Sequence, residues 1–232
     1  MGDATAPSVE DTAAQLDLLR RRVLNVVGHE LRTPITTLRG LAEQLDRRDL
    51  GDEAAFEVHD AIRRTARRVE GLVDDLLVAA GVSTALPVGE PVPTPVAGAV
   101  AEAADRATGS VPTIEGDLDA VVLARPGALR RVLAPLLANA SAYGGGAESV
   151  RIDMVEGEVV VAVIDRGPGI PAAEVGLVTE PFFRGERAVM TAAGLGLGLA
   201  VAAAIAGQHA ATVSVGNGEG GGAVAEVRWP AP

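Results

Sequence analysis

The sequence predicts two domains, an all-α helical hairpin followed by an α+β sandwich. In the first third of the chain, apolar residues recur every three or four positions, which is the rhythm of amphipathic helices. Four prolines then fall within residues 86–95 and interrupt that rhythm. Beyond them, short β-rich runs alternate with helical patterns, as in a sheet covered by helices. The chain of 232 residues is long enough for two domains.

The N-terminal domain, residues 1–84, is expected to form two coiled-coil-like helices joined as a hairpin. A polar break at residues 47–52 separates two apolar seams with coiled-coil spacing. Because one hairpin cannot bury both seams, we expect two copies to pair as a four-helix bundle, which makes the protein a homodimer. The predicted seams are Leu31, Ile35, Leu38, Ala42 and Leu45 in the first helix, and Val58, Ile62, Thr65, Val69, Leu72 and Leu76 in the second.

The prolines mark a linker at residues 85–95, and residues 96–232 are expected to form the α+β domain. Several of its β-rich runs are hairpin neighbours, which favours one mixed sheet under a helical layer. The order suits a nucleotide-binding domain but does not establish one. The expected helices cover residues 96–108, 127–142 and 198–207, and the expected strands cover residues 112–115, 120–124, 149–155, 159–165, 212–215 and 223–229.

The composition excludes several classes of protein. The formal net charge is -11, whereas nucleic-acid surfaces depend on lysine and arginine, so we expect no nucleic-acid partner. The lack of cysteine excludes disulfides, thiolate metal sites and a cysteine nucleophile, and it agrees with a reducing cytoplasm. No run reaches the ~18 apolar residues of a membrane-spanning helix, so we expect no membrane segment in this chain.

His29 is the candidate nucleophile of the helical domain. It lies off the predicted seam, so its imidazole should face solvent, and Thr33 lies one helical turn further on the same side. A neutral imidazole can attack phosphorus while the adjacent Glu30 carboxylate takes or holds the other ring proton. The alternative is an ordinary surface histidine, which is the interpretation we adopt for His59 and His209.

Four segments of the second domain carry candidate nucleotide-binding residues. Asp165 ends a β-rich run before a Gly-Pro-Gly turn, where its carboxylate could accept a hydrogen bond from an exocyclic amine such as that of adenine. The glycine-rich run at residues 194–198 leads into a helix whose unpaired amides could bind phosphate. The Asn139 amide oxygen suits Mg²⁺. Taken singly, each has a simpler interpretation: a turn, a tightly packed helix start and a satisfied polar group.

Together these segments resemble the conserved boxes of sensor histidine kinases, over residues 16–230. His29-Glu30-Leu31-Arg32-Thr33-Pro34 resembles the H-box without a mismatch. Leu136-Leu137-Ala138-Asn139-Ala140 with Tyr143 resembles the N-box, and Asp165-Arg166-Gly167-Pro168-Gly169-Ile170 resembles G1. Glu180-Pro181-Phe182-Phe183-Arg184-Gly185 is similar to the F-box, and Gly194-Leu195-Gly196-Leu197-Gly198-Leu199 to G2. The boxes follow one another in the order of the family.

The resemblance implies an ATP-dependent protein-histidine kinase of the two-component type, with a Bergerat (GHKL-type) ATP-binding fold. It implies autophosphorylation of His29 from ATP and Mg²⁺, transfer to an aspartate of a response regulator receiver domain, and a phosphatase activity that uses Glu30 and Thr33. It also fits the cytoplasmic part of a longer membrane-anchored sensor. The implied nucleotide-binding residues are Asn139, which is also the metal ligand, Tyr143, Asp165, Gly167, Gly169, Ile170, Phe182, Arg184, Arg187, Gly194, Leu195, Gly196, Leu197 and Gly198.

Two positions depart from the family pattern. Pro135 stands where an asparagine is common, and Ala142 stands where a lysine is common. A metal-holding amide and a phosphate-contacting cation are therefore missing. They motivate a second hypothesis, a degenerate dimeric docking or phosphotransfer scaffold with weak or no ATP turnover. A third hypothesis is a conformational ATPase of the same nucleotide-binding superfamily, which would need no exposed histidine.

Overall fold

The computed structural model describes residues 9–46, 51–81, 87–185 and 194–232, with side chains from Val26 onward. By its internal contacts the chain divides into two compact units, Met1–Val73 and Asp74–Pro232. Each unit is considered by itself. None of the helices in the described ranges combines the length and the apolar character needed to cross a membrane.

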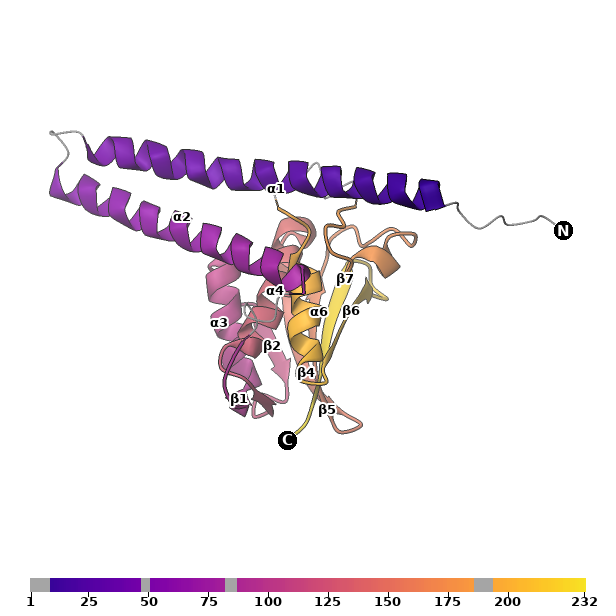
Figure 1. The fold of residues 1–232 in the computed structure, drawn as a ribbon. Coiled ribbons are helices and arrows are strands. Elements are labelled where there is room, and N and C mark those ends of the chain that lie inside the picture. The colour runs from indigo at the N-terminus through magenta and orange to yellow at the C-terminus, as the bar shows by residue number, and fades with distance from the viewer. Residues whose placement is uncertain (1–8, 47–50, 82–86, 186–193) are drawn as a thin grey trace. The chain divides into compact units, whose positions relative to one another are not determined.

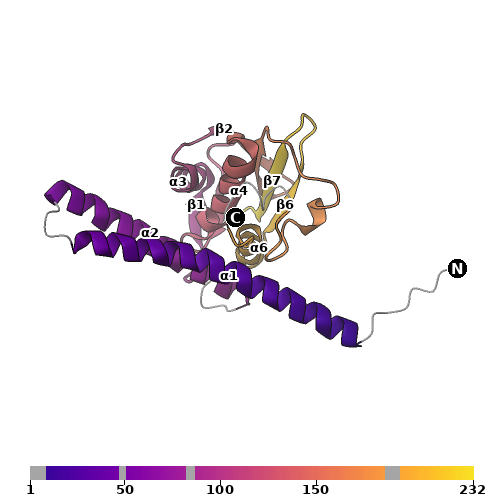
Figure 2. The ribbon, with the colours of Figure 1, turned by 90° about the horizontal axis from the view of Figure 1, so that it is seen from above.

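The two predicted helices are present, and the first unit contains all of the first helix and the second helix as far as Val73. Helix α1 runs over Val9–Leu45 and α2 over Asp52–Ala79, and they lie antiparallel, side by side (Figures 1 and 2). The apolar stripe differs in part from the predicted seam. Pro34 is buried, whereas Ile35 is 55% exposed and Ala42 is exposed as well. A straight α-helix has 3.6 residues per turn, so a stripe with strict coiled-coil spacing drifts around it.

The second unit has a mixed sheet under a helical layer, as predicted, but the sheet has five strands, and the run expected at residues 120–124 belongs to a separate small sheet. The strand order of the five-stranded sheet is β2-β4-β5-β7-β6, with β2 parallel to β4 and the other neighbours antiparallel. The strands are β2 (Thr113–Gly116), β4 (Ala147–Val155), β5 (Glu158–Asp165), β6 (Thr212–Asn217) and β7 (Ala223–Pro230). Because β5 is central, almost all of its residues are buried.

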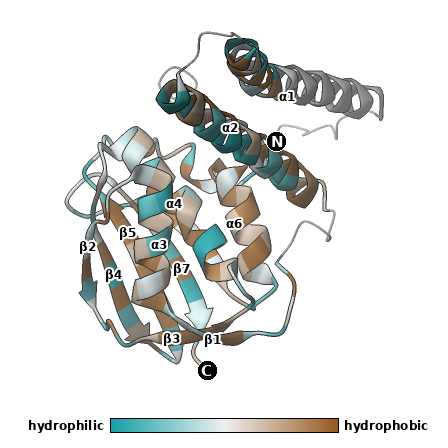
Figure 3. Cartoon of the chain, turned by 90° about the vertical axis from the view of Figure 1, so that its left-hand side faces the viewer, coloured by the Kyte–Doolittle hydropathy of each residue, from teal (hydrophilic) through white to brown (hydrophobic). Residues whose placement is uncertain are grey.

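Three helices cover one face of this sheet (Figure 3): α3 (Val96–Thr108), α4 (Ala128–Gly144) and α6 (Gly198–Gly207). A short 3-10 helix, η2 (Val175–Leu177), lies between β5 and α6 in the chain. The core between helices and sheet is aliphatic, apart from one large ring, that of Trp229 on β7. This agrees with the low aromatic content of 2%.

A small second sheet corrects the predicted linker. Strand β1 (Val92–Pro95) pairs antiparallel with β3 (Val121–Ala124), so the last four residues of the expected linker belong to the α+β unit. Proline is tolerated there because β1 has only one neighbour, and the outer edge of a strand needs no amide donor.

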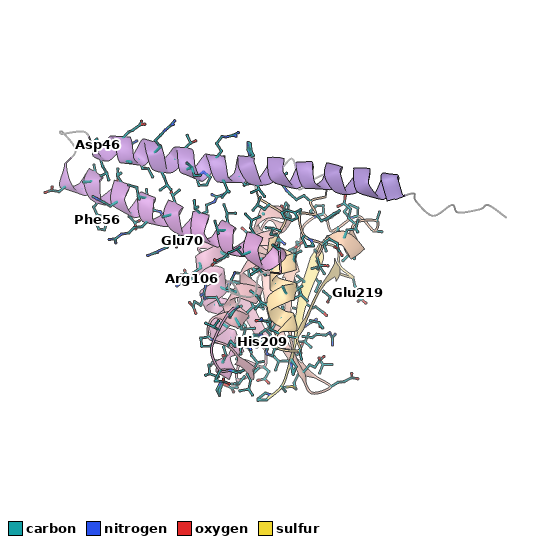
Figure 4. All side chains as sticks on the ribbon, in the orientation of Figure 1. Asp46, Phe56, Glu70, Arg106, His209 and Glu219 are labelled. Atoms are coloured by element: carbon teal, nitrogen blue, oxygen red, sulfur yellow. The ribbon has the colours of Figure 1, made fainter. Side chains whose placement is uncertain are left out.

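His209 is a structural residue rather than an ordinary surface histidine. Its Nδ1 lies 3.0 Å from the carbonyl oxygen of Ile205, and its Nε2 accepts a hydrogen bond from the backbone N–H of Arg125 at 3.1 Å. The ring also lies 4.7 Å from that of Trp229, centroid to centroid. Figure 4 places it near the end of α6. His209 therefore joins the end of α6 to the segment that precedes α4.

Candidate functional site

His29 faces solvent in α1, as predicted. Its side chain is 77% exposed, while that of the neighbouring Glu30 is only 11% exposed. The Glu30 carboxylate oxygen Oε1 lies 3.8 Å from His29 Nδ1, which is an electrostatic contact rather than a hydrogen bond. A carboxylate at this place favours a proton on Nδ1, so the lone pair on Nε2 is left for attack.

Thr33 lies one turn beyond His29 in the same helix. Its hydroxyl donates a hydrogen bond to the backbone carbonyl of His29 at 3.4 Å, and the residue is exposed. The contact is weak by its length. The three predicted residues of the H-box thus lie on one stretch of α1, where His29 and Thr33 are exposed and the Glu30 side chain is mostly covered.

Asp165 is the buried carboxylate of the α+β unit. It ends the central strand β5 and is 9% exposed. Its Oδ1 accepts two backbone hydrogen bonds, from Gly167 N–H at 2.8 Å and from Ala223 N–H at 3.0 Å. These bonds fix the carboxylate and leave Oδ2 as its second acceptor. A fixed acceptor of this kind suits an exocyclic amine such as that of adenine.

The G1 box packs directly against the end of α4. A Cβ on Gly167 would lie 2.7 Å from the Cα of Gly144 and 2.9 Å from the carbonyl oxygen of Tyr143. A Cβ on Gly144 would lie 2.5 Å from the Cγ of Asp165. Neighbouring protein atoms therefore leave no room for a Cβ at either position, so both positions require glycine. The predicted approach of these glycines to the nucleotide base stays a prediction.

Helix α4 also contacts the G2 box. A Cβ on Gly198, the first residue of α6, would lie 2.9 Å from the Cβ of Pro135. Pro135 lies inside α4, where it supplies an apolar contact in place of the amide that the family pattern has there.

Asn139 lies between these two contacts. Pro135, Asn139 and Tyr143 follow at intervals of four, so they share one face of α4. Asn139 is half-buried, and its amide makes no hydrogen bond to another described residue. Its oxygen is thus available to a ligand. Among the described residues, no group of three or more His, Asp or Glu side chains is placed to hold a metal ion.

The F and G2 boxes are tied to each other. The backbone N–H of Phe182 donates to the carbonyl of Gly196 at 2.9 Å. Phe182 has a φ of 65°, an unfavourable value for a phenylalanine. A Cβ on Gly196 would lie 2.5 Å from the carbonyl oxygen of Phe183. The N, G1, F and G2 boxes are thus linked by close contacts, with α4 in the middle.

Some predicted site residues are placed differently. Leu195 and Leu197 are buried, at 4% and 2% exposure, so their side chains belong to the core and only their backbone could contact a nucleotide. Gly194 has a φ of 148° and has nothing within 4 Å of where a Cβ would lie. Arg184 is half-buried, and Arg187 lies outside the described residues.

Some residues that hold the G1 box in place were not predicted from the sequence. Asn217, at the end of β6, hydrogen-bonds to both backbone groups of Ile170. Arg166, within the G1 box, forms a charge-assisted hydrogen bond with Glu148 on β4, which lowers the pKa of the Glu148 carboxyl and raises that of the Arg166 guanidinium. Only the strand pairing brings these residues together, so no local pattern could have revealed them.

Comparison with known families matches both units. Residues 19–80 match the His Kinase A (phospho-acceptor) domain, and residues 124–232 match the histidine kinase-, DNA gyrase B- and HSP90-like ATPase family. The chain is 35% identical over 178 residues to the sensor-type histidine kinase PrrB of Mycobacterium leprae, covering 73% of this chain and 39% of PrrB. It is 33% identical over 181 residues to the probable sensor histidine kinase TcrY of Mycobacterium tuberculosis, and the match covers 75% of this chain and 38% of TcrY. This chain thus spans well under two thirds of the length of each of these two relatives.

Solved structures of related proteins agree with the fold. Full-length ShkA in complex with AMPPNP matches with a TM-score of 0.59 and 25% identity, over 90% of this chain and 45% of that one. The histidine kinase AdeS of Acinetobacter baumannii matches with a TM-score of 0.54 and 23% identity, over 87% of this chain and 97% of that one. The likeness to AdeS shows the fold alone.

Proposed function

Because this chain carries the catalytic core of a sensor histidine kinase, we propose that it transfers the γ-phosphoryl group of ATP to His29. The observation that carries the proposal is the exposed imidazole of α1, with Nδ1 beside the Glu30 carboxylate. We assign the reaction to the cytoplasm, because ATP is its substrate. The alternative of a degenerate scaffold rests on Pro135 and Ala142 alone.

The Asp165 carboxylate and the backbone of the G1 box would bind the adenine. Asp165 Oδ2 accepts from the exocyclic amine, while Oδ1 stays bonded to the backbone N–H groups of Gly167 and Ala223. The phosphates would lie toward the start of α6, where amides at a helix N-terminus favour anions. Mg²⁺, held by the Asn139 oxygen, would neutralise charge on the phosphates. Arg184 and Arg187 of the F-box region are the proposed cationic contacts.

In the transfer, the His29 Nε2 lone pair attacks the γ-phosphorus of ATP. A nitrogen–phosphorus bond forms, the bond from the γ-phosphorus to its bridging oxygen breaks, and ADP leaves with that oxygen. Glu30 stabilises the imidazolium through its Nδ1 proton and can then accept that proton. Catalysis is mainly positioning and charge neutralisation, because the phosphoryl group passes from ATP directly to His29 and no other covalent intermediate is formed.

The phosphoryl group would pass to an aspartate of a response regulator docked on the hairpin, which acts as a homodimer. A phosphatase activity is a second candidate, since the Thr33 hydroxyl lies one turn from His29 on the exposed side of α1. One of the relatives, MprB of Mycolicibacterium smegmatis, is named as a histidine-protein kinase/phosphatase and is 34% identical over 193 residues.

Labelling with γ-labelled ATP tests the kinase. We expect acid-labile, alkali-stable label on the wild-type chain and none on His29→Ala. His59→Ala is the matched control, because His59 is also an exposed helical histidine and should leave labelling unchanged. Label that persists in His29→Ala would refute the assignment of the nucleophile. Tight ATP binding with no label on the wild type would identify a scaffold instead.

A further inference from the structure

Asn217 ties the end of the G1 box to the last hairpin of the sheet. The backbone N–H of Ile170 donates to Asn217 Oδ1 at 2.7 Å, and Asn217 Nδ2 donates to the Ile170 carbonyl at 2.8 Å. One amide side chain thus satisfies both backbone groups of one residue, 47 positions earlier in the chain.

Gly169 provides the space for this contact. Its φ is +71°, and a Cβ there would lie 2.7 Å from Asn217 Oδ1. The Asn217 side chain therefore passes where any other residue at position 169 would place its Cβ. Gly169, the second glycine of the G1 box, thus serves a contact within the protein.

The other strand of the same hairpin holds the start of the G1 box. Ala223, the first residue of β7, donates its N–H to Asp165 Oδ1, and a Cβ on Gly222 would overlap the carbonyl oxygen of Asp165. The β6–β7 hairpin, whose turn carries Glu219 (Figure 4), therefore contacts both ends of the G1 box. At Asp165 the hairpin contributes only backbone atoms, whereas at Ile170 it contributes the side chain of Asn217.

We propose that Asn217 is a positioning residue for the nucleotide site, which acts through the Ile170 backbone to hold the G1 turn ready for the adenine. The inference rests on the proposed ATP binding. A loop that is already ordered binds its ligand more tightly, because less of the binding free energy goes into ordering it. The segment from Arg166 to Ile170 is irregular, so such ties determine where its backbone lies.

Binding assays on the full chain separate this role from a general effect on folding. We expect Asn217→Ala to raise the Kd for ATP about tenfold, since two hydrogen bonds are lost, and to change the Kd for Mg²⁺-tripolyphosphate by less than about twofold. Tripolyphosphate carries no base, so a disturbance confined to the G1 turn should not affect it. Ser214→Ala is the matched control, because Ser214 lies exposed on the same strand and should leave both affinities unchanged.

Asn217→Asp provides a second, isosteric variant. It keeps an acceptor for the Ile170 N–H but cannot donate to the Ile170 carbonyl, so it too should weaken ATP binding selectively. ATP affinity that is unchanged in both variants would overturn the inference, as would an equal loss of ATP and tripolyphosphate affinity. If the wild-type chain bound no ATP, the proposed function would fail first, and that result is distinguishable from the other two.

Discussion

At the scale of single residues, the proposed nucleotide site depends on protein atoms that pack tightly around one carboxylate. Asp165 has two backbone donors on Oδ1 and the Cα of Gly144 against its side chain. Each of these contacts restricts the orientation of the carboxylate. The glycines near it are explained by this packing at least as well as by contact with a nucleotide.

Gly144→Ala tests this packing. The new Cβ would lie 2.5 Å from Asp165 Cγ, closer than real Cβ contacts come, so the carboxylate must shift. We expect ATP affinity to fall by about tenfold or more and the domain to lose about 1–3 kcal/mol of unfolding free energy. Isothermal titration calorimetry and urea unfolding measure the two effects. Gly176→Ala is the control, because nothing lies within 4 Å of that position; equal behaviour of the two variants would contradict the packing argument.

At the scale of elements, α4 lies at the centre of the proposed nucleotide site. Its last turn contacts the G1 box, and Pro135 in its middle contacts the first residue of α6. A proline inside a helix has no backbone N–H, so Pro135 cannot donate the hydrogen bond that other residues of the α4 interior can. The chain keeps α4 continuous through this defect, from Ala128 to Gly144.

Replacing Pro135 by alanine should therefore stabilise α4. Alanine restores the backbone N–H and retains the Cβ that faces Gly198. We expect a gain of about 1–3 kcal/mol in unfolding free energy, below the full helix penalty of proline because the ring loses its packing. Urea unfolding followed by circular dichroism measures this. A loss of stability would mean that the ring contact with α6 outweighs the helix defect.

At the scale of the whole molecule, the hairpin leaves apolar side chains in solvent. Ile35 is 55% exposed on α1, and Phe56, labelled in Figure 4, is 74% exposed on α2. Val73 and Leu77, further along α2, are 43% and 37% exposed. A second copy of the hairpin could cover such exposed apolar side chains, in agreement with the proposed four-helix bundle.

We expect Ile35→Glu to shift the protein from dimer to monomer, because it places a charge in the apolar surface that a second copy would cover. Light scattering after size-exclusion chromatography would show the lower mass. Thr37→Glu is the control, since Thr37 is also exposed but lies on the opposite flank of α1 relative to the buried stripe. A wild-type chain that is monomeric at micromolar concentration, or an Ile35→Glu variant that stays dimeric, would count against this interface.

The sequence by itself determined the helical hairpin, the mixed sheet, the exposed imidazole of His29 and the order of the boxes. These features follow from the local periodicity of apolar residues and from the types of side chain at short spacing, both of which are visible in the sequence. The limits of helices α3 and α6 agree with prediction to the residue. Strand β1 was missed because its prolines indicated a linker, and the seam at Ile35 was placed one residue away from the buried Pro34.

Only the tertiary structure decided which residues hold the proposed nucleotide site together. Gly144 meets Asp165, Pro135 meets Gly198, and Asn217 meets Ile170 because strand order and helix packing bring distant segments into contact. Such pairs leave no periodic trace in the sequence. The glycines could be recognised as necessary from the pattern, but the physical reason, the protein atoms that fill the place of each Cβ, exists only in the folded chain.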